Sequence, residues 1–169
     1  MSKLFQLKTI TINNAVDTAN IIKNLILSST NNLTYRLLVE DICRNTEFAD
    51  EFKIARILYD WAKKHFTYLA DIQTVEYIKE PDRIYNEIMV KGKFVGDCDD
   101  STVLMGCLLI NAGFMPIIRL IELQNQGYFS HIYCYIIING EFVCMDIADK
   151  NDYFITAPNM TNYIDIPVE

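Results

Sequence analysis

The chain has 169 residues, which is the length of a single domain with a substantial core. Hydrophobic residues make up 51% of it and charged residues 22%, with six glycines and four prolines, a composition typical of a folded protein without long flexible linkers. The net charge of −7 repels a phosphate backbone and no local cluster of Lys and Arg offsets it, so we expect no nucleic-acid partner.

The sequence shows no export or membrane segment. The opening residues MSKLFQLKTITINN lack the apolar stretch of a signal peptide, and no later segment reaches about 18 uncharged apolar residues. We therefore expect a soluble, cytoplasmic protein with no membrane partner. Its five cysteines form no CxxC pair and are odd in number, which predicts reduced thiols: Cys43, Cys98, Cys107, Cys134 and Cys144.

The first part of the chain is predicted to be helical after an initial strand over residues 1–12. Asp17 suits the N-cap of a helix whose apolar residues recur on one face: Ile21, Ile22, Leu25 and Ile26. The polar residues SSTNN end this helix. Residues 33–44 predict a second helix.

Thr46 is the expected N-cap of a third helix, in which apolar residues recur at spacings of three and four: Phe48, Phe52, Ala55, Leu58 and Trp61. His65 lies near its end, where a histidine suits the negative end of the helix dipole. Pro81 fits the first turn of a short helix that reaches Met89.

The stretch GDCDDSTVLMGCLL, residues 96–109, predicts a helix that carries a cysteine in its first turn. Asp97 is the expected N-cap, and Gly113 can adopt the left-handed conformation that ends the helix. Asp99 and Asp100 favour the helix dipole, and we expect their charges to point away from the Cys98 sulfur. Three apolar residues of the helix are expected to face inward: Met105, Leu108 and Leu109.

Three apolar runs follow, over residues 115–123, 130–138 and 141–147. The last two are separated by Asn139-Gly140, the strongest short signal for a β-hairpin. Helices therefore come first and an antiparallel sheet second, with the cysteine-bearing helix at the junction. This order predicts an α+β fold.

The hairpin turn fixes which residues of the sheet share a face. If Asn139 and Gly140 form a two-residue turn, counting outward places Tyr133 opposite Asp146 and His131 opposite Ala148. His131 and Asp146 are then diagonal neighbours with Cβ atoms roughly 7–8 Å apart or less, within reach of a hydrogen bond. Cys144 falls on the same face, although core filling is its expected role. Cys43, Cys107 and Cys134 are likewise expected to be packing residues.

Cysteine, histidine and aspartate are the parts of a cysteine acyl-transfer site. Their context resembles the transglutaminase-like superfamily of papain-like cysteine enzymes, through GDCDD before an apolar helix, SHIYCYIIING, and EFVCMDIAD. The segment YLADIQTVEYIKEP also resembles the one that precedes the cysteine in bacterial and phage members. The resemblance covers roughly residues 49–149 and leaves residues 1–45 unmatched.

The resemblance implies a single papain-like domain over residues 1–169, with an amino-terminal helical extension, 1–45, and a catalytic core, 46–149. It implies Cys98 as nucleophile, His131 as general base and Asp146 as the acid that orients the ring. The chain departs from the family pattern at Ile132, where an aromatic residue is common, and at Ile147, where a proline is usual. Cleavage of a peptide or isopeptide bond in a peptide or protein substrate, without a cofactor, is the implied activity.

The mechanism needs a thiolate and an oxyanion site. The positive end of a helix and a nearby imidazolium are expected to lower the pKa of the Cys98 thiol below its free value of about 8.5. The Cys98 N–H is a natural oxyanion donor, and Gln73 and Tyr77 are candidates for the second donor.

Three alternatives remain open at this stage. A transglutaminase would pass the acyl group from the same triad to an amine. A metal site could use Cys98, His131 and nearby aspartates, but the expected second thiolate or paired histidine is missing, so we expect no metal. A non-catalytic protein could retain the fold and associate with phage virion components.

Overall fold

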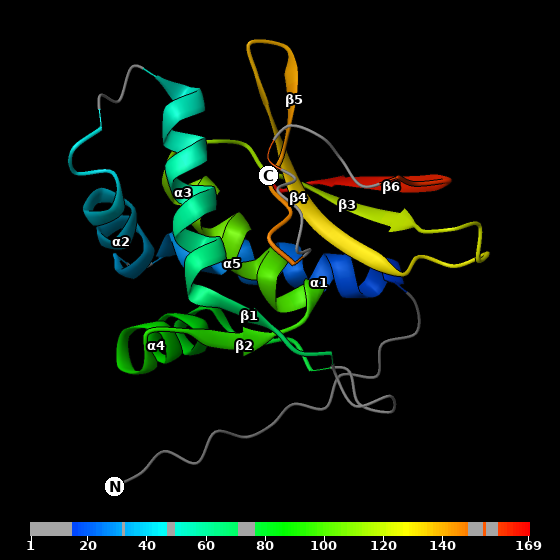
Figure 1. The fold of residues 1–169 in the computed structure, drawn as a ribbon, viewed down its shortest axis with the longest axis horizontal. Helices are drawn as coiled ribbons and strands as arrows, with labels where there is room; N and C mark the ends of the chain where they lie inside the picture. The colour runs from blue at the N-terminus through cyan, green and yellow to red at the C-terminus, as the bar shows by residue number, and fades with distance from the viewer. Residues whose placement is uncertain (1–14, 32, 47–49, 71–76, 149–153, 155–158) are drawn as a thin grey trace, which may run out of the picture.

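The computed structural model describes residues 15–31, 33–46, 50–70, 77–148, 154 and 159–169. The predictions made for the strand at 1–12, for Phe48 and for Gln73 lie outside these residues. Within them the fold is α+β: five α-helices, one of which packs on a four-stranded antiparallel sheet (Figure 1). None of the described helices is long and apolar enough to cross a membrane.

The helices follow the predicted order along the chain. They are α1 (Ala15–Ser28), α2 (Thr34–Ile42), α3 (Glu51–His65), α4 (Pro81–Lys91) and α5 (Cys98–Asn111), with a short 3-10 turn, η1 (Ser29–Asn31), after α1. Pro81 occupies the first turn of α4, and Gly92 ends that helix in the left-handed conformation with φ of 75°. The prediction for this helix is confirmed, with an end two residues beyond Met89.

Two of the predicted N-caps are wrong. Asp17 lies inside the first turn of α1, a position that the helix dipole also favours for an acid. The cap of α3 is Asp50 rather than Thr46, since the Asp50 side chain accepts a 3.0 Å hydrogen bond from the Lys53 N–H. The Thr46 N–H donates instead to the Cys43 carbonyl and closes the turn after α2.

The main sheet has the strand order β5-β4-β3-β6, with every pair antiparallel. Its strands are β3 (Ile117–Glu122), β4 (His131–Ile138), β5 (Glu141–Cys144) and β6 (Asn162–Pro167); a separate parallel pair joins β1 (Phe66–Tyr68) to β2 (Phe94–Gly96). The sequence predicted β3, β4 and β5. It did not predict β1, β2 or β6, which are short or carry no hairpin signal.

The hairpin between β4 and β5 has the predicted turn and register. Asn139 and Gly140 have φ of 52° and 83°, the left-handed conformations that a type I′ turn requires. Ile138 pairs with Glu141, and the register continues to Tyr135 opposite Cys144.

Helix α5 lies at the centre of the molecule rather than on its surface. It packs on β4 and is surrounded by the other four helices (Figure 1). Met105, Leu108 and Leu109 are buried as expected, and burial extends around the helix, since eleven of its 14 residues are buried. Gly113, with φ of 91°, ends the helix as predicted.

Helix α1 is part of the core, although it belongs to the segment that the family resemblance does not cover. Ala19, Ile22 and Ile26 are fully buried. At the crossing with α5, a Cβ atom on Gly106 would lie 2.2 Å from Ile26 Cδ1. Glycine is therefore required at position 106 for the two helices to approach this closely.

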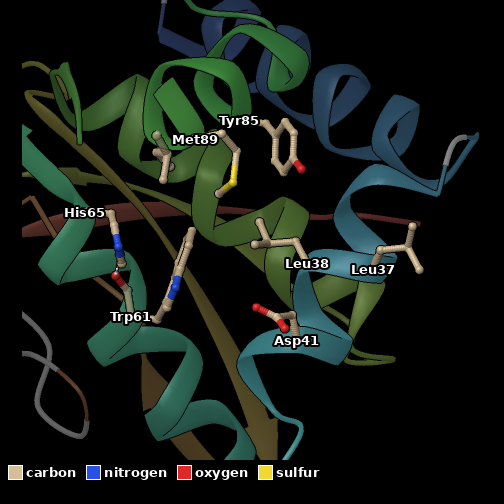
Figure 2. A pocket seen from close by; sticks show the side chains of 8 residues that line it. Leu37, Leu38, Asp41, Trp61, His65, Tyr85 and Met89 are labelled. Atoms are coloured by element: carbon tan, nitrogen blue, oxygen red, sulfur yellow. Dashed lines mark hydrogen bonds between the residues drawn. The ribbon is translucent and has the colours of Figure 1, made fainter. Parts of the chain in front are cut away.

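A cavity of about 340 Å³ lies between α2, α3 and α4 (Figure 2). Its wall includes Trp61 and His65, whose rings stack with centroids 4.3 Å apart. His65 is the last residue of α3, and its Nδ1 lies 2.7 Å from the Trp61 carbonyl oxygen. The predicted placement of His65 at the end of the helix is confirmed.

We expect Gly106→Ala to destabilise the protein by about 1–3 kcal/mol, the usual cost of overpacking a core. In an isolated helix the change from glycine to alanine is stabilising. The sign of the change in the free energy of unfolding therefore tests the packing argument. Urea unfolding of the variant measures it. In an Ile26→Ala background, which removes the clashing atoms, Gly106→Ala should be neutral or stabilising; a stabilising effect in the presence of Ile26 would contradict the packing argument.

Candidate active site

The start of α5 is organised by Asp97, the predicted N-cap. One oxygen of its side chain accepts hydrogen bonds from the N–H groups of Asp99 at 3.0 Å and Asp100 at 3.4 Å. Gly96 precedes the cap because Asp100 folds back over it: a Cβ at position 96 would lie 2.2 Å from Asp100 Oδ2. These contacts hold Cys98 at the first position of the helix. At this position the backbone N–H has no hydrogen-bond acceptor within the helix.

The carboxylate of Asp100 points away from the sulfur, as expected. It accepts a 2.8 Å hydrogen bond from the Lys79 N–H and forms a 3.3 Å ion pair with Lys79 Nζ. Burial raises the pKa of Asp100 to about 6, against the stabilising effect of Lys79 on its charged form.

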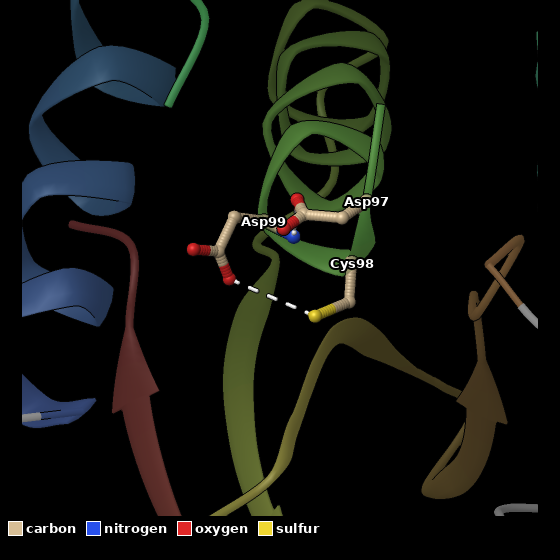
Figure 3. A group of neighbouring side chains, drawn as sticks. All are labelled: Asp97, Cys98 and Asp99. Carbon is tan, nitrogen blue, oxygen red and sulfur yellow. Dashed lines mark hydrogen bonds between the residues drawn. The ribbon is translucent and has the colours of Figure 1, made fainter. Parts of the chain in front are cut away.

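The carboxylate of Asp99 points toward the Cys98 sulfur, so the expectation that its charge would point away is wrong. It is buried, and its Oδ1 accepts a 3.8 Å hydrogen bond from the Cys98 thiol (Figure 3). Burial, followed by the charges of Asp99 and Asp97, raises the pKa of the Cys98 thiol well above its ordinary value. The prediction of a lowered pKa is therefore wrong for this arrangement. Because α5 is central, its first-turn carboxylates Asp99 and Asp100 are buried and cannot extend into solvent.

Thr102 joins the start of α5 to the start of β4. Its hydroxyl lies 2.7 Å from the carbonyl oxygen of Cys98 and 3.1 Å from that of Ile132. The Cys134 thiol donates to the Thr102 carbonyl at 3.6 Å. The backbone of Ile132 in turn hydrogen-bonds the Cys98 sulfur and opposes the rise in its pKa.

His131 and Asp146 form the hydrogen bond that the hairpin register predicts. His131 Nε2 lies 2.6 Å from Asp146 Oδ2, and the Asp146 side chain is fully buried. The other carboxylate oxygen accepts from the Ala148 N–H at 3.0 Å, and the Asp146 carbonyl accepts from the Tyr59 hydroxyl at 3.1 Å. Asp146 is thereby held by hydrogen bonds from two further residues. The second ring nitrogen of His131, Nδ1, takes no part in the bond to Asp146.

Cys98 and His131 line the same small cavity, of about 110 Å³. Asp146 lies close enough to contribute to the raised pKa of the thiol. The structure thus brings the three residues of the predicted triad into one region. Between the described residues Cys98 and His131 there is no hydrogen bond, because the thiol donates to Asp99.

Of the two oxyanion candidates, only Tyr77 is among the described residues. Gln73 lies outside the described residues. Tyr77 accepts a hydrogen bond from the Arg83 guanidinium on α4, and it is not among the residues that line the cavity.

Several residues of the cavity wall were missed by the sequence analysis. They come from α1, from β3 and from the residues around the start of β4: Ala15, Thr18, Leu120, Phe129, Ser130 and Ile132. Thr18 and Cys98 are far apart in the sequence, and no motif links them. The role of Thr102 had a weak local signal, since a hydroxyl four residues after Cys98 can bond back to its carbonyl.

The other four cysteines are buried, whereas Cys98 is half-buried. Their predicted packing role is confirmed, and burial raises the pKa of Cys107 and of Cys144 to about 12. Cys144 packs with Tyr133 and Tyr135 in a separate small core cluster. A thiol reagent should therefore reach Cys98 first.

The ligand atoms of Asp97, Cys98 and Asp99 lie within 4.8 Å of one another, close enough to surround one cation (Figure 3). The group includes neither a histidine nor a second thiolate. Most structural zinc sites have these ligands.

No family model matches the chain, and a search of curated proteins finds no match either.

Replacing Asp99 with Asn should lower the pKa of the Cys98 thiol, because it removes the closest of the charges that oppose ionisation. We expect alkylation of Cys98 by iodoacetamide at neutral pH to become about tenfold faster, the equivalent of one pKa unit. The rate is measured between pH 6 and 10 by intact-protein mass spectrometry. Asp60→Asn, an equal charge change on the surface of α3, should leave the profile unchanged; an unaltered profile in Asp99→Asn would refute this electrostatic assignment.

Thr102→Val removes the shared hydroxyl at nearly constant shape. The expected cost is about 1 kcal/mol in the free energy of unfolding, with a roughly tenfold slower alkylation of Cys98 as sulfur and ring lose their relative position. Thr102→Ser keeps the hydroxyl and should behave as the parent protein does. Equal alkylation rates in the Val and Ser variants would show that the hydroxyl does not position the site.

Proposed function

We propose that the chain is a cysteine-dependent hydrolase that cleaves a peptide or isopeptide amide through a thioester, with a transglutaminase-like, papain-like core. The observation that supports it most is the buried 2.6 Å bond between His131 and Asp146, at a cavity that also contains the half-buried thiol of Cys98. A histidine held by a buried carboxylate beside a reachable thiol is the arrangement that nucleophilic acyl transfer requires.

Asp146 sets the orientation and tautomer of the ring. Because Nε2 bonds to the carboxylate, Nδ1 is the nitrogen left to exchange a proton with Cys98. The raised pKa of the thiol means that it is protonated at neutral pH while it donates to Asp99. The reaction requires the thiol to leave Asp99 and reach His131, which then removes its proton as the sulfur attacks.

The rest of the reaction follows from the same groups. The sulfur bonds to the amide carbonyl carbon, and the developing oxyanion is stabilised by the Cys98 N–H at the positive end of α5. His131 returns the proton to the amine as the carbon–nitrogen bond breaks. Water, activated by His131, then hydrolyses the thioester and restores the thiol.

The half-buried, protonated thiol is also what a non-catalytic protein with this fold would contain, for example a component of a phage particle. Reactivity separates the two possibilities. In a non-catalytic protein the thiol would react no faster with His131 present than without it.

The decisive experiment compares alkylation of Cys98 in the parent protein and in His131→Ala. Loss of the base should slow the reaction at pH 7 by about a hundredfold, the typical contribution of general base catalysis. The chain has two histidines, so His65→Ala, which removes the other one, is the matched control and should react normally. If the rate of Cys98 alkylation has the same pH dependence in the parent protein and in His131→Ala, the proposal is wrong.

Hydrolysis is separated from transfer by incubating the full chain with a glutamine peptide and a fluorescent amine. Release of ammonia or of a shorter peptide supports the hydrolase, whereas incorporation of the amine supports a transglutaminase. Cys98→Ala should abolish either outcome.

A further inference from the structure

The cavity beside Cys98 has the properties of a substrate subsite. Its wall combines apolar residues of three elements with the hydroxyl-bearing Thr18 and the carboxylate of Asp99. We infer that it binds the side chain next to the attacked carbonyl, and that it accepts small uncharged residues such as alanine, serine and valine. This inference rests on the proposed function and names the class of substrate.

Position ties the cavity to the acyl part of the substrate. The Cβ atom of the acyl residue is separated from the carbonyl carbon by only two bonds, and the Cys98 sulfur bonds to that carbon. The side chain must therefore lie in space that Cys98 itself borders. Both Cys98 and His131 line this cavity, and neither lines the wider one between α2, α3 and α4.

The volume limits the size of that side chain. A closed apolar cavity of about 150 Å³ holds a benzene ring, and this cavity measures about 110 Å³. An aromatic ring is too large, while a methyl, hydroxymethyl or isopropyl group fits.

Charge excludes acidic side chains. The carboxylate of Asp99 lines the cavity and lies 3.8 Å from the sulfur, with Asp97 beside it. An aspartate or glutamate side chain would enter a confined space against this negative charge, where repulsion is stronger than in water.

Helix α1 supplies the wall that sets these limits. Ala15 and Thr18 are held in place because the same helix packs through Ile26 against Gly106 of α5. Thr18 is 4% exposed, and its Oγ1 has no hydrogen-bond partner in the part of the chain that the structure describes. This hydroxyl is enclosed by the protein, with less than 1 Å² of accessible surface, so Thr18 contributes bulk to the wall rather than a hydrogen bond to a bound side chain.

The test uses N-acetyl-glycyl chloromethyl ketones whose last residue is Gly, Ala, Ser, Val, Phe or Glu. Cys98 modification is followed by intact-protein mass spectrometry. The Ala, Ser and Val probes should react about tenfold faster than the Phe and Glu probes, the discrimination expected of a small binding pocket.

Ala15→Leu fills the cavity and should slow the Ala, Ser and Val probes by a larger factor than the Gly probe. Asn20→Leu adds the same bulk at an exposed position of α1 and should change none of the rates. Equal rates for all probes, with alkylation still dependent on His131, would overturn the subsite and leave the proposed function standing. Loss of the dependence on His131 would overturn the proposed function itself.

Discussion

The candidate site depends on one short connection, the hydroxyl of Thr102 between the carbonyl groups of Cys98 and Ile132. The two carbonyls belong to a helix and a strand that the chain forms more than 30 residues apart, so no local rule holds them together. The hydroxyl has one proton to share between the two carbonyls, so the connection is worth only about 1 kcal/mol. Its importance is positional, because Ile132 follows His131 directly, and a shift of about 1 Å between nucleophile and base is enough to cost most of a reaction rate.

The central position of α5 explains the electrostatics of the site. On a surface helix the first-turn acids would extend into water and favour the dipole. Here Asp99 and Asp100 are buried, so each needs a neighbour inside the protein: Asp100 has Lys79, and Asp99 faces the thiol. The helix dipole stabilises an anion by about 0.3–1 kcal/mol, or about 2 kcal/mol at best. Burial and two nearby carboxylates outweigh it, since one pKa unit already corresponds to about 1.4 kcal/mol.

Local rules predicted much of the fold from the sequence. Asn139-Gly140 fixed the hairpin, and counting outward from the turn was enough to pair His131 with Asp146. Asp97 and Gly113 marked the ends of α5 in the same way. The contacts that could not be predicted are those between distant segments: β6 beside β3, α1 against Gly106, and Thr18 in the cavity wall. The direction of Asp99 was missed for the same reason, because it depends on whether α5 is central or on the surface.

The raised pKa of the thiol places a condition on any chemistry at Cys98. A protonated thiol lowers the population of the reactive thiolate, yet a thiolate of higher basicity is intrinsically the better nucleophile, with a Brønsted coefficient of about 0.4–0.5. The two effects partly compensate if the proton is removed during the attack rather than before it. In the proposed reaction that requirement falls on His131, whose ring is held by Asp146, which in turn accepts hydrogen bonds from the Ala148 N–H and the Tyr59 hydroxyl. The proposed reaction thus begins from a neutral thiol and a pre-oriented base, rather than from a resting ion pair.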